Sequence, residues 1–236
     1  RGGYRRLGNN AITATGFRTM TMPELGIYGE RPAGIYPHHA VLDTLHYGLL
    51  PGKNVVIYGN NTYALSLARE LIKHGANVKV VSPTEFSVKS EHGDFEVIIG
   101  RVRYVRGRGR VEKVLVNNEW ITADTLVISM FKPFNPFPSF RAVGQAVIET
   151  YDPGIVIESS RIMAKELTSE SSEFVLIDSD LPVYPGNRVS RDVRRVIISC
   201  RGCRVIVNDK EYVISGDASV IELPDVDRVS IRRVVS

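Results

Sequence analysis

The sequence is poor in cysteine and glutamine. Only two cysteines, Cys200 and Cys203, and one glutamine, Gln145, occur among its 236 residues. Two thiolates cannot complete a tetrahedral metal site alone, and no histidine lies close to them in the sequence, so no resident metal is expected. A low content of heat-labile side chains is common in proteins from hot environments and favours a thermophile source.

Long hydrophobic runs are also absent. No apolar stretch reaches the roughly 20 residues that a membrane-spanning helix requires. Residues 1–6 are basic, but the apolar segment of a secretory signal does not follow them. We therefore expect a soluble, cytoplasmic protein without a membrane span.

Charge of one sign is not strongly in excess. The chain carries 30 basic and 26 acidic residues, a formal net charge of +4. This excess favours anionic ligands such as nucleotide phosphates only weakly, and it is too dispersed to argue for nucleic acid as a partner.

The clearest local pattern is a βαβ unit. The β-branched run 54–58 predicts a buried strand, residues 59–62 break it, apolar residues at helical spacing predict a helix over 63–74, and residues 77–81 predict a second strand. Asn61 or Thr62 is available to cap the helix. Such a unit is expected to have parallel strands and a right-handed crossover.

The remaining pattern predicts an α/β fold, with a Rossmann-like parallel sheet, a β-meander and a small antiparallel β C-terminal domain. Residues 124–130 are apolar enough to return to the parallel sheet. The meander is predicted over residues 96–105, 110–117 and 119–122, and further helices over 38–47 and 155–167. Short C-terminal strands are predicted over residues 174–177, 195–200, 203–207, 211–215, 219–223 and 228–235.

The turn after the first strand is the candidate nucleotide site. Gly59, Asn61 and Ala64 occupy the three glycine positions of the dinucleotide fingerprint, and the helix that follows would direct its amides toward a cleft shaped for a diphosphate. Asn61 replaces the glycine that lets the backbone approach the phosphates. Ser82 stands where an acidic residue usually contacts the ribose, and with Lys79 and Lys89 nearby this slightly favours a 2′-phosphorylated nucleotide. A βαβ unit that binds nothing is the alternative.

A longer succession of motifs extends this pattern. It consists of Ala14-Thr15-Gly16, Arg31-Pro32-Ala33-Gly34-Ile35-Tyr36, residues 48–53, residues 107–114, residues 123–129 and Val143-Gly144-Gln145-Ala146. In this order they resemble the pyridine nucleotide-disulfide oxidoreductase superfamily, and within it the amine and amino-acid dehydrogenase branch similar to dye-linked proline dehydrogenase and sarcosine oxidase subunits. The resemblance covers roughly residues 11–167.

The resemblance implies FAD and NAD(P) as cofactors. It places Thr15, Gly16, Gly144 and Gln145 beside the flavin, although Gln145 stands where the family has an aspartate. It also implies three segments: residues 1–50 as a remnant of the flavin domain with a connecting helix, 51–135 as the NAD(P) domain, and 136–170 as the return to the flavin domain. The pattern of short strands makes residues 171–236 a small β domain. The family's N-terminal flavin half is not in this sequence, and residues 82–96 leave little room for its second crossover helix. Another subunit or a missing segment is expected to complete the flavin site.

Three other features have simpler alternatives. Cys200-Arg201-Gly202-Cys203 has the spacing of a redox pair or half a zinc site, but its expected place at a hairpin tip favours structural or disulfide-linked cysteines. His38 and His39 begin a helix and lack further ligands, which argues against catalysis. Alternate arginines from Arg101 to Arg110 could contact RNA or a partner subunit, although a solvated face is the simpler reading.

The sequence therefore favours part of an FAD- and NAD(P)-dependent oxidoreductase that transfers hydride between nicotinamide and flavin. No acid, base or nucleophile is required of the protein in that chemistry. The alternative is a non-catalytic nucleotide-binding or scaffolding subunit of a larger complex with a degenerate site.

Overall fold

A computed structural model describes residues 11–86 and 95–234. The chain forms two compact units: Thr19–Phe131, called the parallel-sheet unit below, and Arg1–Arg18 with Lys132–Ser236, called the split unit. Residues 19–50 thus group with the βαβ segment and residues 136–170 with the C-terminal strands. The assignment of those two segments to a flavin domain stays a prediction.

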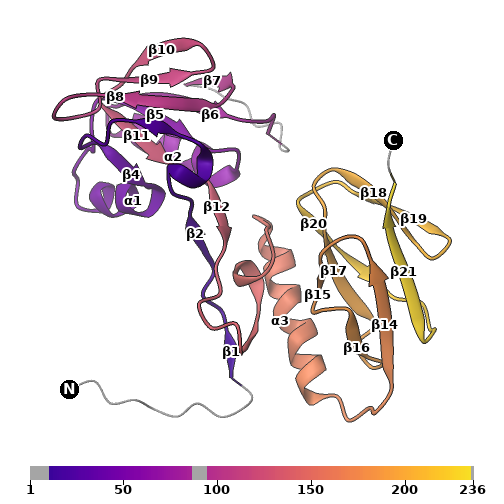
Figure 1. The fold of residues 1–236 in the computed structure, drawn as a ribbon. Helices are drawn as coiled ribbons and strands as arrows, with labels where there is room; N and C mark the ends of the chain where they lie inside the picture. Colours follow the sequence, from indigo (N-terminus) through magenta and orange to yellow (C-terminus); the bar gives the residue numbers. More distant parts are fainter. Residues whose placement is uncertain (1–10, 87–94, 235–236) are drawn as a thin grey trace, which may run out of the picture. The chain divides into compact units, whose positions relative to one another are not determined.

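The parallel-sheet unit is built on five strands that run in one direction (Figure 1). Their spatial order is β4 (Ile35–Pro37), β11 (Thr125–Ile128), β5 (Asn54–Tyr58), β6 (Asn77–Ser82) and β7 (Glu96–Ile99). Every neighbouring pair is parallel. The predicted Rossmann-like sheet is therefore confirmed, including the return of β11 to its centre beside β5.

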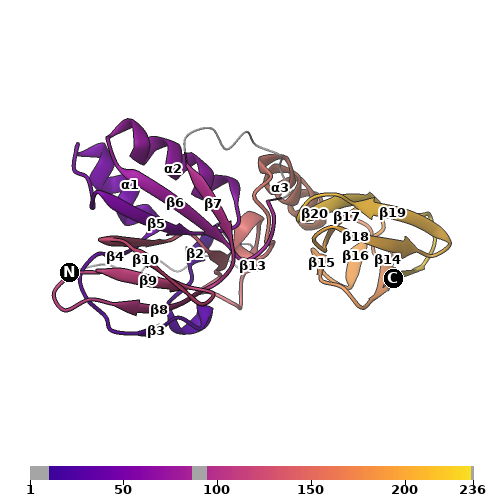
Figure 2. The ribbon, with the colours of Figure 1, turned by 90° about the horizontal axis from the view of Figure 1, so that it is seen from above.

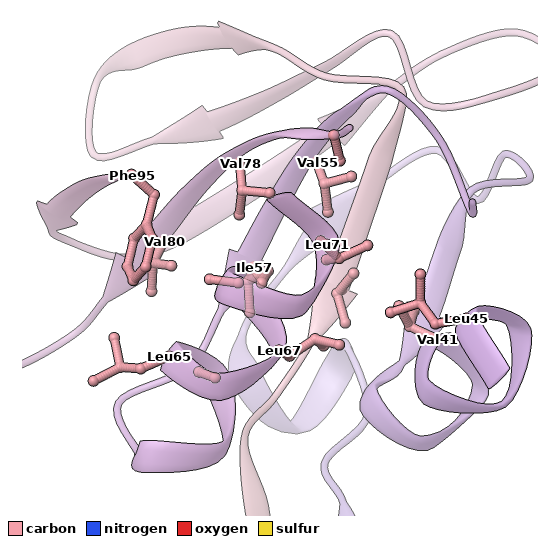
Figure 3. Close-up of a cluster of buried hydrophobic side chains, with 14 residues drawn as sticks. Val41, Leu45, Val55, Ile57, Leu65, Leu67, Leu71, Val78, Val80 and Phe95 are labelled. Atoms are coloured by element: carbon pink, nitrogen blue, oxygen red, sulfur yellow. The ribbon is translucent and has the colours of Figure 1, made fainter. Parts of the chain in front are cut away.

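Strand β5 shows why both faces of this sheet are covered. Val55 and Ile57 pack into one buried cluster, and Val56 and Tyr58 into another. Successive side chains of a strand point to opposite faces, so a run without polar alternation must be buried on both sides. Figure 3 shows the first cluster, in which Leu67 and Leu71 of a helix lie against Ile57.

The helices α1 (His38–His46) and α2 (Thr62–Lys73) cover the first face. A four-stranded sheet covers the second, as the view in Figure 2 shows, with the order β10 (Glu119–Thr122), β9 (Lys113–Val116), β8 (Val102–Arg106) and β3 (Tyr28–Gly29). A short 3-10 helix, η1 (Pro23–Leu25), precedes β3.

The prediction of one continuous strand over residues 96–105 is wrong. Its first half is β7, which joins the parallel sheet beside β6, and its second half is β8, which belongs to the four-stranded sheet. The chain turns at Gly100, where a Cβ atom would lie 2.4 Å from the Asn117 side chain. The predicted meander therefore contains β8, β9 and β10, with β3 added parallel to β8.

The split unit begins with β1 (Ile12–Thr13), which pairs in parallel with β13 (Arg141–Ala142). A short 3-10 helix, η2 (Gly144–Ala146), and α3 (Pro153–Thr168) follow β13. The strands β2 (Phe17–Thr19) and β12 (Phe131–Pro133) pair with each other where the chain passes between the units.

The C-terminal strands form two stacked sheets. One has the order β16 (Arg188–Ser190), β14 (Phe174–Ser179), β21 (Arg228–Arg233), β18 (Cys203–Val207) and β19 (Lys210–Ile214), and the other β15 (Val183–Tyr184), β17 (Arg195–Ser199) and β20 (Ala218–Glu222). Val196 and Ile198 of β17 face the first sheet, and Ile197 faces α3. The predicted antiparallel domain is confirmed except for one parallel pair, β14 with β21.

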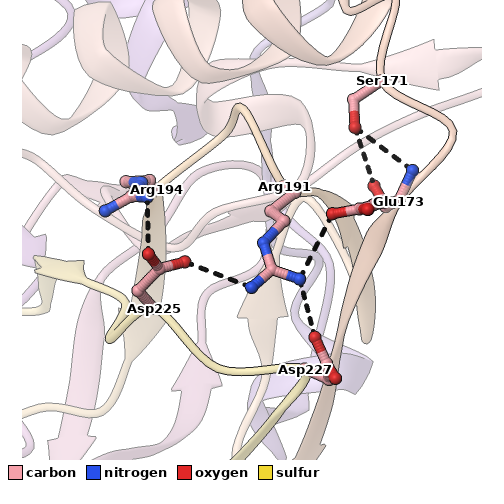
Figure 4. A network of polar contacts seen from close by, with 6 residues as sticks. All are labelled: Ser171, Glu173, Arg191, Arg194, Asp225 and Asp227. Carbon is pink, nitrogen blue, oxygen red and sulfur yellow. Dashed lines mark hydrogen bonds and ion pairs between the residues drawn. The ribbon is translucent and has the colours of Figure 1, made fainter.

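Ion pairs connect the loops at one end of these sheets (Figure 4). Arg191 contacts Glu173 at 3.3 Å, Asp225 at 3.4 Å and Asp227 at 2.7 Å, and Asp225 also pairs with Arg194 at 3.1 Å. The carboxylates are more than half exposed, so each pair contributes little alone. Together they fix the chain before β14 and after β20 around one guanidinium.

Candidate nucleotide site at the carboxyl edge of the parallel sheet

The order of the strands defines where a ligand would bind. From β5 the chain moves to β6 and β7 on one side, and it then returns through the meander to β11 on the other side of β5. The point where this direction reverses lies between β5 and β11. In open α/β sheets, ligands bind outside the carboxyl ends of the strands at such a point.

Gly59 directly follows β5 at this edge, and its neighbours leave no room for a side chain. A Cβ atom there would lie 2.7 Å from the Ser129 carbonyl oxygen and 2.8 Å from the Ala64 Cβ. The glycine and the small Ala64 thus let α2 approach the ends of β5 and β11 closely. The two residues perform the packing role that the fingerprint assigns to its glycines.

Asn61 is the N-cap of α2, and its carboxamide is engaged at both ends. Its Oδ1 accepts a hydrogen bond from the Ala64 amide at 3.0 Å, and its Nδ2 donates to the Ser129 carbonyl at 2.6 Å. The side chain is buried and its backbone is extended, with φ of −135°. The expectation that the amides at this helix mouth face an open cleft is therefore wrong for the Ala64 amide, because the carboxamide occupies that position.

Ser82 ends β6 at the same edge and is completely buried. Its hydroxyl donates to the Thr84 carbonyl and so closes the turn that follows the strand. Its carbonyl accepts the Gly100 amide at 2.8 Å, which places the ends of β6 and β7 side by side. Lys79 pairs with Glu96 at 2.5 Å in the middle of the strand, away from this edge. Lys89 lies outside the described residues.

The structure adds a buried pair that sequence reasoning missed. His38 follows β4, and its Nδ1 lies 3.0 Å from the Ser129 Oγ at the end of β11. Burial and the neighbouring His39 lower the pKa of His38 to about 4. Its ring also lies edge-on to Phe131, with a centroid distance of 5.4 Å. The only available signal was that both residues directly follow parallel strands.

Ser129 therefore connects three elements at the switch point. Its amide donates to Tyr58 at 2.8 Å, its carbonyl accepts from Asn61, and its hydroxyl meets His38. This network holds the ends of β4, β11 and β5 together with the start of α2. The polar groups of Asn61, Ser129 and His38 at the candidate nucleotide turn are consequently bonded to one another or to the backbone.

The four predicted flavin-side residues lie together in the split unit. Thr15-Gly16 follows β1 and Gly144-Gln145 follows β13, and these two strands are paired. The Thr15 hydroxyl donates a hydrogen bond to the Phe134 carbonyl at 2.6 Å. The backbone amide of Gly144 donates to the Ser159 hydroxyl at 2.8 Å. The side-chain amide of Gln145 donates to the Thr150 carbonyl at 2.8 Å. Gly16 and Gly144 have positive φ angles of 73° and 63°, which favour glycine.

Cys200 and Cys203 form a disulfide. The expected hairpin tip is wrong, because β17 and β18 on either side of the pair belong to different sheets. The disulfide thus lies at a corner where the chain changes sheets, and both cysteines are buried in the core between them. The described residues contain no cluster of three or more histidine, cysteine, aspartate or glutamate residues placed to hold a metal.

Comparison with known proteins agrees with the parallel-sheet assignment. Residues 49–132 match a family model described as putative NAD(P)-binding. That segment contains β5, α2, β6 and the return strand β11. No curated protein sequence matches the chain. In the described part of the chain, the helices are too short or too polar to cross a membrane.

Solved structures of oxidoreductases share the fold. A FAD-dependent pyridine nucleotide-disulphide oxidoreductase from Desulfovibrio vulgaris aligns over 84% of this chain and 62% of its own, with 16% identity and a TM-score of 0.51. A NAD-dependent persulfide reductase from A. fulgidus aligns over 84% and 47%, with 14% identity and a TM-score of 0.53. Histamine dehydrogenase from Rhizobium sp. 4-9 aligns over 68% and 31%, with 14% identity and a TM-score of 0.51. The chain thus spans about a third to three fifths of the length of these proteins.

Proposed function

We propose that the parallel-sheet unit binds NAD(P) and that the chain is part of an FAD- and NAD(P)-dependent oxidoreductase. The observation that supports this most directly is the turn from β5 through Gly59 into α2 at the switch point of the sheet. It lies within the segment that matches the NAD(P)-binding model. The fold shared with flavoprotein oxidoreductases supports a redox role.

The backbone of this turn fits a dinucleotide better than its side chains do. A strand, a tight turn and a helix place the positive end of the helix dipole at the sheet edge. The Asn61 carboxamide now supplies the oxygen that accepts the Ala64 amide. In our proposal the diphosphate approaches the other amides of the first turn and competes with this side chain, so that Asn61 weakens binding without abolishing it.

The flavin side of the proposal rests on the split unit. Thr15, Gly16, Gly144 and Gln145 follow two paired strands, but the three polar groups described above bond within the chain. These residues do not form a flavin site by themselves. We propose that polypeptide beyond the described residues, in another subunit or a further segment, completes it. A bound flavin would exchange hydride with the nicotinamide, and this chain would position the nucleotide.

A second candidate is a non-catalytic nucleotide-binding or scaffolding subunit. The observation that favours it is the complete engagement of Asn61 and Ser82 by the protein itself. No buried side-chain nitrogen or oxygen in the described part of the chain lacks a hydrogen-bond partner. A visible absorption spectrum of the chain purified together with the polypeptide that completes the flavin site separates the two candidates, because only a flavoprotein shows the flavin band.

The first prediction concerns Asn61→Gly. Removal of the carboxamide frees the Ala64 amide and admits the phosphates, so the affinity for NADH or NADPH should rise roughly tenfold, the equivalent of about 1.4 kcal/mol. The same change removes a cap and one buried hydrogen bond, so the unfolding free energy should fall by about 1–2 kcal/mol. Calorimetric titration and urea denaturation measure the two effects.

Asn208→Gly is the matched control, because Asn208 lies in a hairpin turn of the split unit with φ of 50°. It should leave nucleotide affinity unchanged. If neither the wild-type protein nor Asn61→Gly releases or absorbs heat with either nucleotide, the NAD(P) assignment is wrong. The scaffolding subunit is then the candidate that remains.

The second prediction concerns nucleotide choice. Burial raises the pKa of Tyr58, and the cations Arg101 and Arg103 oppose that rise. Arg101 also follows Gly100, which is bonded to Ser82. NADPH should therefore bind more tightly than NADH, and Arg101→Ala should reduce that preference roughly fivefold to tenfold, consistent with about 1 kcal/mol for an exposed charge contact. Arg69→Ala, on α2, serves as the control in parallel titrations.

A further inference from the structure

The outer face of the four-stranded sheet carries a row of aromatic residues. Tyr28 of β3 pairs with Tyr104 of β8, Tyr104 pairs with Leu115 of β9, and Leu115 pairs with Trp120 of β10. Residues paired directly across strands share one face of a sheet. The inner face holds Val105, Val114 and Val116 in the core, so the row faces outward. We call Tyr28, Tyr104, Leu115, Trp120, Arg106 and Lys113 the aromatic-basic face.

The aromatic rings in this row are accessible. Tyr28 is 70% exposed and Trp120 is 41% exposed. The Tyr104 and Trp120 rings meet edge to face, with their centroids 6.2 Å apart. Strands lie about 4.8 Å apart, so a row across four strands extends over roughly 14 Å. That length corresponds to two or three extended nucleotides, with a stacking platform at each end.

Cations flank the row. The Arg106 guanidinium lies 5.2 Å and the Lys113 ammonium 5.0 Å from the centre of the Trp120 ring. Six of the twelve lysines and arginines of the parallel-sheet unit lie between residues 101 and 113, against one of its eleven acidic residues. Two nearby carboxylates bond to backbone amides: Glu30 accepts the Gly107 amide at 2.6 Å, and Glu112 accepts the Arg108 amide at 3.3 Å. Basic residues are therefore concentrated in this stretch of the sequence, which supplies Arg106 and Lys113 to the face, although the net charge of the chain is small.

From this arrangement we propose that the aromatic-basic face binds single-stranded nucleic acid. Bases would stack on Tyr28 and Trp120, and phosphates would pair with Arg106 and Lys113. Proteins that bind single strands without sequence preference combine aromatic side chains, on which bases stack, with cations that follow the phosphate backbone. This activity is separate from NAD(P) binding, because the face lies on the opposite side of the parallel sheet from α2 (Figure 2).

Other occupants fit this face less well. The centres of protein interfaces are depleted of lysine, whereas here the Lys113 ammonium lies 5.0 Å from the centre of the Trp120 ring. A symmetric contact with a second copy would bring Arg106 and Lys113 close to their own equivalents, which like charges disfavour. Nucleic acid supplies both a π-face for the rings and an anion for the cations.

Trp120 is the only tryptophan of the chain, so it reports binding directly. The full chain is titrated with a short oligothymidylate and, separately, with oligouridylate at low salt, while tryptophan fluorescence is recorded. Stacking should quench the emission, and the affinity should fall steeply as salt rises. Sodium polyphosphate is the comparison ligand, since it offers the charge without the bases and should bind more weakly with little quenching.

Two variants test the residues. Tyr28→Ala should weaken oligonucleotide binding roughly tenfold, the loss of one stacked base. Lys113→Gln should lower the slope of log affinity against log salt by about 0.7, the value for one phosphate contact on a single strand. Tyr47→Ala is the matched control, because Tyr47 is 78% exposed at the end of α1 and lies outside this face.

Three outcomes would overturn the proposal. One is the absence of quenching and of binding at low salt, and another is equal weakening by Tyr28→Ala and Tyr47→Ala. The third is a blue shift of the Trp120 emission that grows with protein concentration and accompanies dimer formation in sedimentation, because it would assign the face to a second copy of the chain.

Discussion

Lowering the pH from 7 to 4 should destabilise the parallel-sheet unit by about 3 kcal/mol through His38 alone. The unfolded chain binds this proton with a pKa near 6.5, whereas burial lowers the pKa in the folded protein to about 4. Between these values the unfolded state holds more protons, so the stabilisation is complete above pH 6.5 and is lost as the pH falls toward 4. The fall of the pKa from 6.5 to about 4, at about 1.4 kcal/mol for each unit, corresponds to about 3.5 kcal/mol, and about 3 kcal/mol of this is lost by pH 4, where the folded histidine is half protonated.

The substitution that isolates the effect is His38→Gln, which retains a polar group near Ser129 but does not titrate. Urea denaturation followed by Trp120 fluorescence reports on this unit, because the only tryptophan lies in it. The variant should be less stable than wild type at pH 7, and its stability should decline less between pH 6.5 and 4. His46→Gln, exposed on the last turn of α1, is the control and should keep the wild-type profile. An unchanged slope in His38→Gln would contradict the assignment of the acid sensitivity to this residue.

The elements with strong local patterns were predictable from the sequence. Strand β5 agrees with the prediction at both ends, and α2 begins one residue earlier than predicted, with Asn61 as its cap. Both depend on β-branched runs, helical spacing and a capping side chain, which act between neighbours in sequence. The parallel pairing of β5 with β6 follows from them, because two parallel neighbours need a crossover connection and α2 supplies it.

The contacts that decide the state of the site were not predictable. Asn61 reaches Ser129 across 68 residues, and His38 reaches it across 91. No local rule reports which strand lies beside β5, so the sequence could not reveal that the carboxamide has a second partner. The division of residues 96–105 between two sheets has the same origin, because both halves are rich in β-branched residues and only the turn at Gly100 separates them.

The close approach at Gly59 leads to the last prediction. Gly59→Ala should lower the unfolding free energy of the parallel-sheet unit by about 3 kcal/mol, at the upper end of the range for overpacking. The added methyl would lie 2.7 Å from the Ser129 carbonyl oxygen, 2.8 Å from the Ala64 Cβ and 2.9 Å from the Ser129 Cβ. Each of these atoms is fixed to the backbone, so no side-chain rotation relieves the contact and either α2 or β11 must move.

Gly109→Ala provides the comparison, since a Cβ atom at Gly109 meets nothing within 4 Å and its φ is not positive. Urea denaturation monitored by Trp120 should show a shifted midpoint for Gly59→Ala and none for Gly109→Ala. The double variant Gly59→Ala/Ala64→Gly should recover only part of the loss, because the contact with the Ser129 carbonyl persists and a glycine within α2 costs up to about 1 kcal/mol. Wild-type stability in Gly59→Ala would mean that α2 does not hold the close position on which the proposed nucleotide turn depends.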